Sequence, residues 1–336
     1  MQPPRRVPVL EPGLATAIGS LPHTDPWLAA EVVLRELPDL PAVPQLPGRD
    51  PREGMLAQWL GALPEVEIAP DGSVRVAGVS NEAPVCSVTP EAHSGLLALL
   101  DVCNERGVAP GRLKVQVTGP LTLGTALVHA GVDPVPAFRR SFVLATAWAT
   151  AIQQLVARRV PGAALVLVFD EPGLVQWSRG TAPLEREVAI DVLSGALAAV
   201  DCISGVHVCG DGDLGLALES GPDVLGVEVA DRVIDEAVAL EHFLGGEGWI
   251  AWGAIPTDRP VGDSVEPHWR RLLELWRALA ARGCDPETLR SRALVTPACG
   301  LAGYGATQAE RMLGLTRQLA DRLRDPASTA RLVLGA

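Results

Sequence analysis

A histidine and a cysteine stand two residues apart at the end of one apolar run, in the stretch GVHVCGDGD (residues 205–213). Residues i and i+2 of a β-strand point to the same side, so the imidazole of His207 and the thiol of Cys209 would face one point. Imidazole and thiolate are both ligands of Zn²⁺, and the pair is therefore half of a candidate metal site. A cysteine packed beside a histidine in the protein core is the alternative interpretation.

The chain around this pair alternates between short apolar runs and longer segments with apolar residues at helical spacing. This pattern is typical of a parallel sheet with crossover helices. Eight runs are expected to be strands, at residues 15–20, 42–47, 113–119, 164–172, 203–210, 224–230, 249–256 and 293–300. Eight such units in roughly 300 residues predict an α/β fold, a single (β/α)8 TIM barrel. We expect this barrel to span residues 15–336, after an N-terminal extension of residues 1–14.

One segment does not fit the repeat. Residues 66–79, VEIAPDGSVRVAGV, alternate between apolar and polar side chains on both sides of a Pro-Asp-Gly sequence. Alternation around such a turn predicts a β-hairpin, inserted between the second and third strands of the barrel.

The carboxyl ends of the expected strands carry polar residues, and in TIM barrels these ends hold the catalytic groups. His207 and Cys209 end the fifth run, Glu228 ends the sixth and Cys299 ends the eighth. One imidazole, two thiols and one carboxylate suit a tetrahedral Zn²⁺ ion. We therefore expect these four residues to form a zinc site at one rim of the barrel. A structural zinc site is the alternative, although such sites mostly take paired cysteines from loops.

With these ligands, the sequence resembles the catalytic barrel of the cobalamin-independent methionine synthases. Their superfamily also includes uroporphyrinogen decarboxylase and the zinc-dependent coenzyme M methyltransferases. The resemblance rests on the motifs TAIGSLPHTD, VTGPLTL, FDEP, HVCGD, DVLGVEVA and TPACGL, which together run from residue 15 to about residue 304. Full-length relatives carry a further N-terminal barrel, so the resemblance implies a stand-alone catalytic barrel.

The resemblance implies zinc-dependent transfer of a methyl group to the thiol of homocysteine, which is a step of methionine biosynthesis. In the family, zinc lowers the pKa of this thiol and holds it as a thiolate for attack on the methyl group. The family's four zinc ligands correspond to His207, Cys209, Glu228 and Cys299. The backbone of Ile18, Gly19 and Ser20 corresponds to the segment that receives the carboxylate of the amino acid, and Asp170 to the acid that receives its ammonium group. A simple turn at residues 19–20 and a helix cap at Asp170 are the alternatives.

Three departures from the family pattern concern the methyl donor. The aromatic residue that packs against folate corresponds to small residues near Ala126, and the carboxylate after the DEP motif corresponds to Gln176. The family's acid-assisting histidine would fall in GAIPTD (residues 253–258), which contains none. We therefore expect a folate or a corrinoid as the methyl donor, with a corrinoid protein or a different small donor as alternatives to folate, and we assign no catalytic proton donor.

Three other functions are compatible with parts of the pattern. Alkyl transfer to a coenzyme M-like thiol would use the same zinc site, but such an acceptor has no ammonium group to meet Asp170. A porphyrinogen decarboxylase should carry an arginine-rich cleft, whereas these strand ends carry acids and thiols. A non-catalytic zinc-binding barrel would need only the four ligands.

Composition narrows the class of protein further. The net charge of −12 and the absence of a clustered basic surface in the sequence argue against nucleic-acid binding. No run approaches the ~18 apolar residues of a membrane span, and the first residues lack the apolar core of a signal peptide. Six cysteines scattered through a long acidic chain suit metal binding or catalysis in a reducing compartment. We therefore expect a cytoplasmic protein that contacts neither membranes nor nucleic acids.

Overall fold

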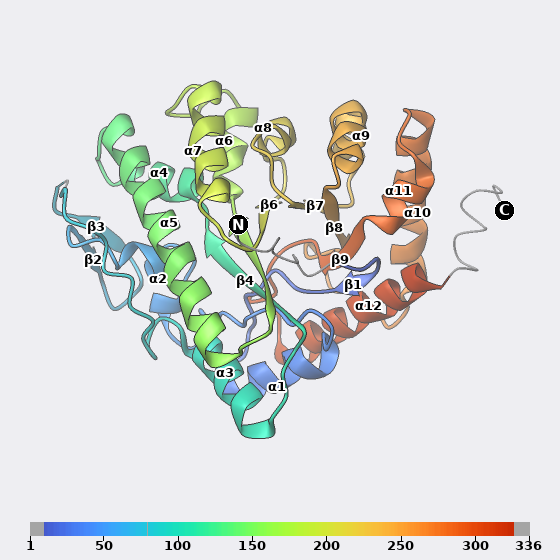
Figure 1. Ribbon diagram of the computed structural model, residues 1–336, viewed down its shortest axis with the longest axis horizontal. Coiled ribbons are helices and arrows are strands. Elements are labelled where there is room, and N and C mark those ends of the chain that lie inside the picture. Colours follow the sequence, from blue (N-terminus) through green and yellow to red (C-terminus); the bar gives the residue numbers. More distant parts are fainter. Residues whose placement is uncertain (1–9, 79, 326–336) are drawn as a thin grey trace, which may run out of the picture.

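The computed structural model describes residues 10–78 and 80–325, in which helices surround a curled parallel sheet (Figure 1). The sheet has seven strands in the order β1-β9-β8-β7-β6-β5-β4. Their bounds are β1 Leu14–Ala15, β4 Arg112–Thr118, β5 Ala164–Asp170, β6 Ile203–Val208, β7 Val224–Glu228, β8 Trp249–Ile255 and β9 Ala293–Pro297. Residues 1–9 of the expected N-terminal extension lie outside the described residues, and its last residues lead into β1.

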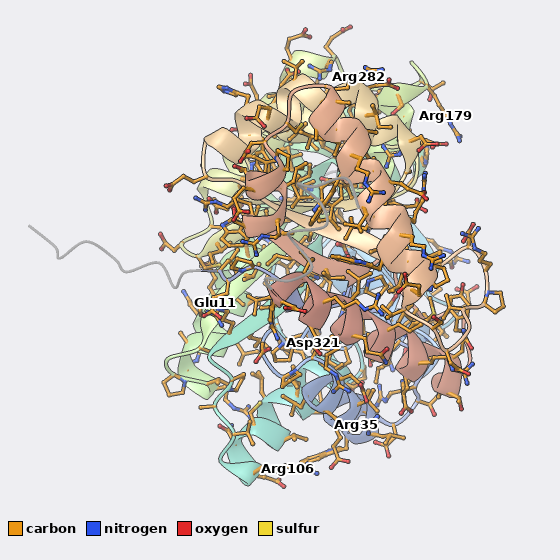
Figure 2. All side chains as sticks on the ribbon, turned by 90° about the vertical axis from the view of Figure 1, so that its right-hand side faces the viewer. Glu11, Arg35, Arg106, Arg179, Arg282 and Asp321 are labelled. Carbon is orange, nitrogen blue, oxygen red and sulfur yellow. The ribbon has the colours of Figure 1, made fainter. Side chains whose placement is uncertain are left out.

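The helices lie around the outside of the sheet, and charged side chains such as Arg106, Arg179 and Arg282 lie at the outer margin of the molecule (Figures 1 and 2). The helices are α1 Pro26–Glu36, α2 Ala57–Leu60, α3 Ser94–Arg106, α4 Pro120–His129, α5 Pro134–Arg159, α6 Val175–Ser178, α7 Arg186–Ala198, α8 Leu214–Glu219, α9 Ala237–Gly245, α10 Glu266–Ala281, α11 Pro286–Ser291 and α12 Ala306–Arg324. Of these helices, none combines the length and hydrophobicity needed to span a lipid bilayer.

The expectation of a closed, eight-stranded (β/α)8 TIM barrel is wrong. In the described chain, residues 42–47 form no strand but only isolated parallel bridges, to Lys114 on one side and to Ser20 on the other. The segment AVPQLP contains Pro44 and a second proline, and proline has no N–H to donate to a strand ladder. The sheet therefore ends at β1 and β4 and stays open, with seven strands.

The expected hairpin is confirmed. Strands β2 (Val66–Ile68) and β3 (Val74–Val76) pair antiparallel as a separate two-stranded sheet. In the turn between them, the backbone N–H of Ser73 donates a 2.9 Å hydrogen bond to Asp71 Oδ1. This is the local bonding by which aspartate favours turns. Residue 79, the last of the expected hairpin, lies outside the described residues.

Alternate residues of the sheet face two different cores, because successive side chains of a strand point to opposite faces. In β5, Leu165 and Leu167 belong to the large apolar core between sheet and helices. Val166 and Val168 belong to a smaller apolar cluster, which lies on the inner face of the curled sheet. Asp170 follows at the next position on that inner face. In β5 the inner face is thus apolar along the strand and polar at its carboxyl end.

Helix α4, which follows β4, begins against a buried carboxylate. Glu171 Oε1 accepts from the N–H of Leu121 (2.8 Å), and its Oε2 accepts from the N–H of Thr122 (2.7 Å). These N–H groups at a helix N-terminus have no partner within the helix, and an anion there is favourable. A Cβ atom on Gly119 would fall 2.2 Å from Glu171 Oε1, so the helix can bind this carboxylate only with glycine at residue 119.

We predict that Gly119→Ala destabilises the fold by about 1–3 kcal/mol, because the added methyl group must displace a side chain fixed by several hydrogen bonds. Urea unfolding measures the change. The matched control is Gly111→Ala, since a Cβ there meets no atom within 4 Å, and its effect should stay within about 0.5 kcal/mol. If the two variants unfold at the same urea concentration, the Glu171 side chain can move aside without a cost in stability and the prediction is wrong.

Candidate metal centre

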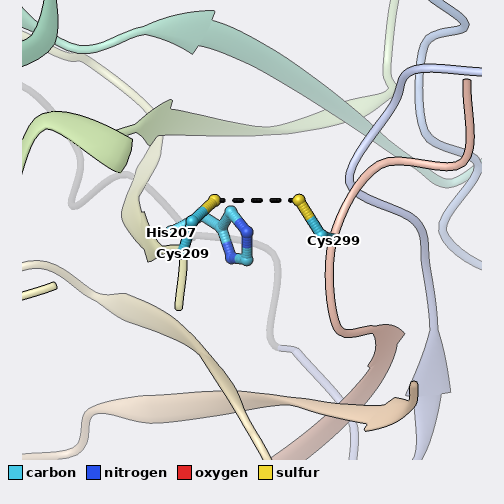
Figure 3. Close-up of side chains that lie close together, drawn as sticks. All are labelled: His207, Cys209 and Cys299. Carbon is cyan, nitrogen blue, oxygen red and sulfur yellow. Dashed lines mark hydrogen bonds between the residues drawn. The ribbon is translucent and has the colours of Figure 1, made fainter. Parts of the chain in front are cut away.

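Three side chains from distant parts of the sequence meet at the carboxyl edge of the sheet (Figure 3). His207 lies in β6, Cys209 follows that strand, and Cys299 follows β9. One ligand atom of each lies within 4.8 Å of the other two. The structure therefore brings together three of the four residues expected to bind zinc.

The imidazole of His207 is buried, with only 2% of the residue exposed. Within residues 10–78 and 80–325, neither ring nitrogen has a hydrogen-bond partner of good geometry. Buried polar groups almost always have a partner, so a histidine of this kind needs an explanation. A metal ion beside the ring would provide one.

The two thiols have the separation that a tetrahedral metal requires. Cys209 Sγ and Cys299 Sγ lie 3.9 Å apart, and both cysteines are free. With Zn–S bonds of about 2.3 Å, two sulfurs on a tetrahedral ion lie about 3.8 Å apart. The donor set of one imidazole and two thiols suits zinc in type as well as in spacing. The residues present therefore fit a zinc ion.

Proton sharing between the thiols makes one of them acidic. The pKa of Cys299 is lowered, first because Cys209 hydrogen-bonds to its sulfur and second because the His207 ring lies beside it. The same hydrogen bond, together with burial, raises the pKa of Cys209. The neighbours of Cys299 thus favour its thiolate form, and thiolate is the form that binds metals.

Glu228, the fourth expected ligand, lies outside this group of three. It is the last residue of β7 and is half-buried. Burial raises its pKa, and the guanidinium of Arg232 acts in the opposite direction. Arg232 also donates a 3.2 Å hydrogen bond to the carbonyl oxygen of Gly212, in the loop that follows Cys209. Glu228 therefore lies near the centre, and its carboxylate interacts with the positive charge of Arg232.

Asp170 stands beside the centre, at the end of β5. Its backbone is paired with that of His207, and the residue is 4% exposed. Among the described residues, its Oδ1 has no hydrogen-bond partner. Burial raises the pKa of Asp170 to about 6, although the charges of His207 and Lys114 act against this effect. The carboxylate is thus available to a cationic group that enters the site.

The Ile18–Ser20 segment runs beside the loop that carries Cys299. A Cβ on Gly300 would fall 2.0 Å from Ser20 Oγ, and the N–H of Leu301 donates a 2.8 Å hydrogen bond to the Ser20 carbonyl. The segment expected to receive a substrate carboxylate is therefore next to the thiols.

Lys114 is a buried residue of this site that the sequence analysis missed. Its ammonium donates to the carbonyl oxygen of Ile18 (2.9 Å) and to Gln116 Oε1 (3.3 Å). Burial lowers the pKa of Lys114 to about 8, against the raising effect of Asp170. The available signal was the alternation within β4, where Lys114, Gln116 and Thr118 occupy every second position and are all buried. These polar side chains face inward and support the edge of the site.

Comparisons with known proteins add no family for this chain. No protein-family model matches it, and no curated protein does. Among solved structures, one match is an endo-fucoidan hydrolase from glycoside hydrolase family 107. The two chains are 11% identical with a TM-score of 0.38, and the match covers 95% of this chain and 93% of the hydrolase. A likeness this distant has no bearing on function.

We predict that the purified chain binds about one zinc ion, since one cluster holds the three ligands. Cys209→Ser or Cys299→Ser should remove most of the bound zinc, as measured by elemental analysis, while circular dichroism stays unchanged. The fold should persist because its core lies between sheet and helices, away from the metal. Cys86→Ser, in a loop remote in sequence from the three ligands, is the control and should retain zinc. Unfolding on metal removal would identify a structural site instead.

Proposed function

We propose that this chain transfers a methyl group to the thiol of homocysteine, forming methionine, with Zn²⁺ bound by His207, Cys209 and Cys299. The observation that carries the proposal is the meeting of one imidazole and two thiols beside a buried carboxylate. They lie at the carboxyl edge of a parallel sheet, which is where such sheets bind their ligands. A zinc ion held there would lower the pKa of a bound thiol, so that its sulfur reacts as the thiolate.

The number of ligands favours catalysis over a structural role. Catalytic zinc sites use three protein ligands and leave a position for water or substrate, whereas structural sites are closed by four. Among residues 10–78 and 80–325, three residues form the cluster and Glu228 lies outside it. A homocysteine thiol can therefore take the fourth position. We propose that Glu228 holds this position when substrate is absent, since a hard carboxylate exchanges readily for a soft thiolate.

The groups around the cluster suit an amino acid. Asp170 offers a buried carboxylate for the ammonium group, and the backbone of the Ile18–Ser20 segment would receive the carboxylate. The Lys114 ammonium donates a hydrogen bond to the Ile18 carbonyl oxygen, so this segment is held in one position before substrate arrives. Pre-ordering of this kind lowers the entropy cost of binding.

Asp170 also favours the binding of homocysteine over that of a coenzyme M-like acceptor. A sulfonate would bring a second negative charge toward this buried carboxylate and would leave it without a cationic partner. Buried carboxylates without partners are costly, so the site favours a thiol that carries an ammonium group.

We propose a folate or a corrinoid as the methyl donor. The altered positions near Ala126 and at Gln176 are the reason for including the second donor class. The cytoplasm is the proposed location, because free thiols at the centre need a reducing compartment.

Anaerobic incubation of the zinc-loaded chain with homocysteine tests this function. Methyltetrahydrofolate and methylcobalamin are supplied in turn, and methionine is measured by mass spectrometry. We expect methionine from one donor, and none with Cys299→Ser. If a zinc-loaded chain that binds homocysteine forms methionine with neither donor, the proposed reaction is wrong for both donor classes.

Asp170→Asn should weaken the binding of homocysteine about ten- to hundredfold, because a charge-assisted hydrogen bond contributes roughly 1.5–3 kcal/mol. Calorimetric titration of the zinc-loaded variant measures this loss. Mercaptopropionate is the control ligand, since it has the thiol and the carboxylate but no ammonium group. Its affinity should hardly change, and zinc should stay bound. Equal losses for the two ligands would mean that Asp170 supports the fold rather than the ammonium group.

A further inference from the structure

The two thiols of the centre face each other across the edge of the sheet (Figure 3). Their sulfurs lie 3.9 Å apart, whereas a disulfide bond is about 2.05 Å long. Both cysteines lie just beyond a strand, Cys209 after Val208 and Cys299 after Pro297, so neither is held by the ladder of the sheet. Modest movements of two loops can therefore bring the sulfurs into bonding distance.

Both thiols are also within reach of a small oxidant, since each residue is partly exposed. The remaining cysteines are placed differently. Cys103 and Cys284 are buried, and the Cys284 thiol donates to the carbonyl oxygen of Ala237. Cys202 precedes β6 and therefore lies at the opposite edge of the sheet from Cys209. Cys86 lies in the loop between β3 and α3, so Cys209 and Cys299 are the pair whose sulfurs the structure places side by side.

We propose that Cys209 and Cys299 form a reversible disulfide when the metal-free chain meets a peroxide. Two thiols and one hydrogen peroxide give one disulfide and two waters. The two S–H bonds and the O–O bond break, and one S–S bond and two O–H bonds form. Each sulfur gives up one electron to the peroxide oxygens, which take the two thiol protons and leave as water. A thiol reductant reverses the step by exchange.

Metal binding and the disulfide exclude each other, because both require the same two sulfurs. A disulfide sulfur is no thiolate and is a poor zinc ligand, while a zinc-bound thiolate is not free to react with its neighbour. This modification site depends on the two thiols alone and does not rest on the proposed methyl transfer. The centre would thus be open to metal only in a reduced chain.

Counting free thiols in the full chain tests the proposal. The chain is stripped of metal with a chelator, treated with one equivalent of hydrogen peroxide and titrated with a thiol reagent under denaturing conditions. We expect the six thiols to fall to four, with full recovery after dithiothreitol. Peptide mapping should link the peptide of Cys209 to that of Cys299, and zinc should bind again only after reduction.

Cys209→Ser and Cys299→Ser are independent test variants, and neither should lose two thiols. Cys202→Ser is the matched control, and its five thiols should fall to three. The proposal is overturned if metal-free wild type keeps all six thiols, if mapping links other cysteines, or if either test variant still loses two. Preloading with zinc should preserve six thiols. A chain that binds no zinc yet forms the disulfide would contradict the proposed function while leaving this inference intact.

Discussion

Cys209 follows β6 and Cys299 follows β9, and two further strands lie between these two in the sheet. In a flat sheet, strands separated in this way would be roughly 14 Å apart, since neighbours are about 4.8 Å apart. The sulfurs are nevertheless 3.9 Å from each other. The curl of the sheet is therefore the constraint on which the site depends. It directs side chains from several strand ends toward one point, and it separates an inner face from the face that the helices cover.

The inner face of the sheet combines an apolar region, which stabilises the fold, with a group of buried charged and polar side chains, whose burial costs free energy. Along the strands it is packed with apolar side chains such as Val166 and Val168, which stabilise the curl. At the carboxyl edge it holds Asp170 and His207, and further down β4, level with Val166, it holds Lys114; all three are nearly inaccessible to water. Burial disfavours the charged forms of Lys114 and Asp170, and their opposite charges only partly offset this. Stability alone would favour apolar residues at these positions, as it does along the rest of β5.

The meeting of His207, Cys209 and Cys299 could be predicted from the sequence, because each residue lies at or just after the carboxyl end of an expected strand. The i, i+2 placement of His207 and Cys209 on a strand needs only the geometry of β-structure. Closure of the sheet was not predictable in the same way. It depends on whether residues 42–47, which contain Pro44, can form the backbone hydrogen bonds of a strand between β1 and β4. The position of the Glu228 side chain relative to the cluster could not be predicted, because it depends on nearby charges such as Arg232, and the order of residues in the sequence does not show which charges are near. The alternation of Lys114 with Gln116 and Thr118 in β4 places these three side chains on one face, but their burial also depends on the curl of the sheet, which the spacing alone does not give.

The pairing of β1 with β9 joins Leu14 to Leu294, so the first and the last strands of the sheet in sequence order are neighbours. Contacts between residues so distant in sequence form slowly, because a very long loop must close before they are made. The strands from β4 to β9 pair in sequence order and can add one at a time during synthesis. Cys299 follows the last of them, so a growing chain holds only part of the cluster until nearly all of it has left the ribosome. A chain truncated before residue 299 would therefore lack one of the three side chains that form the candidate metal centre, and no later folding step could restore it.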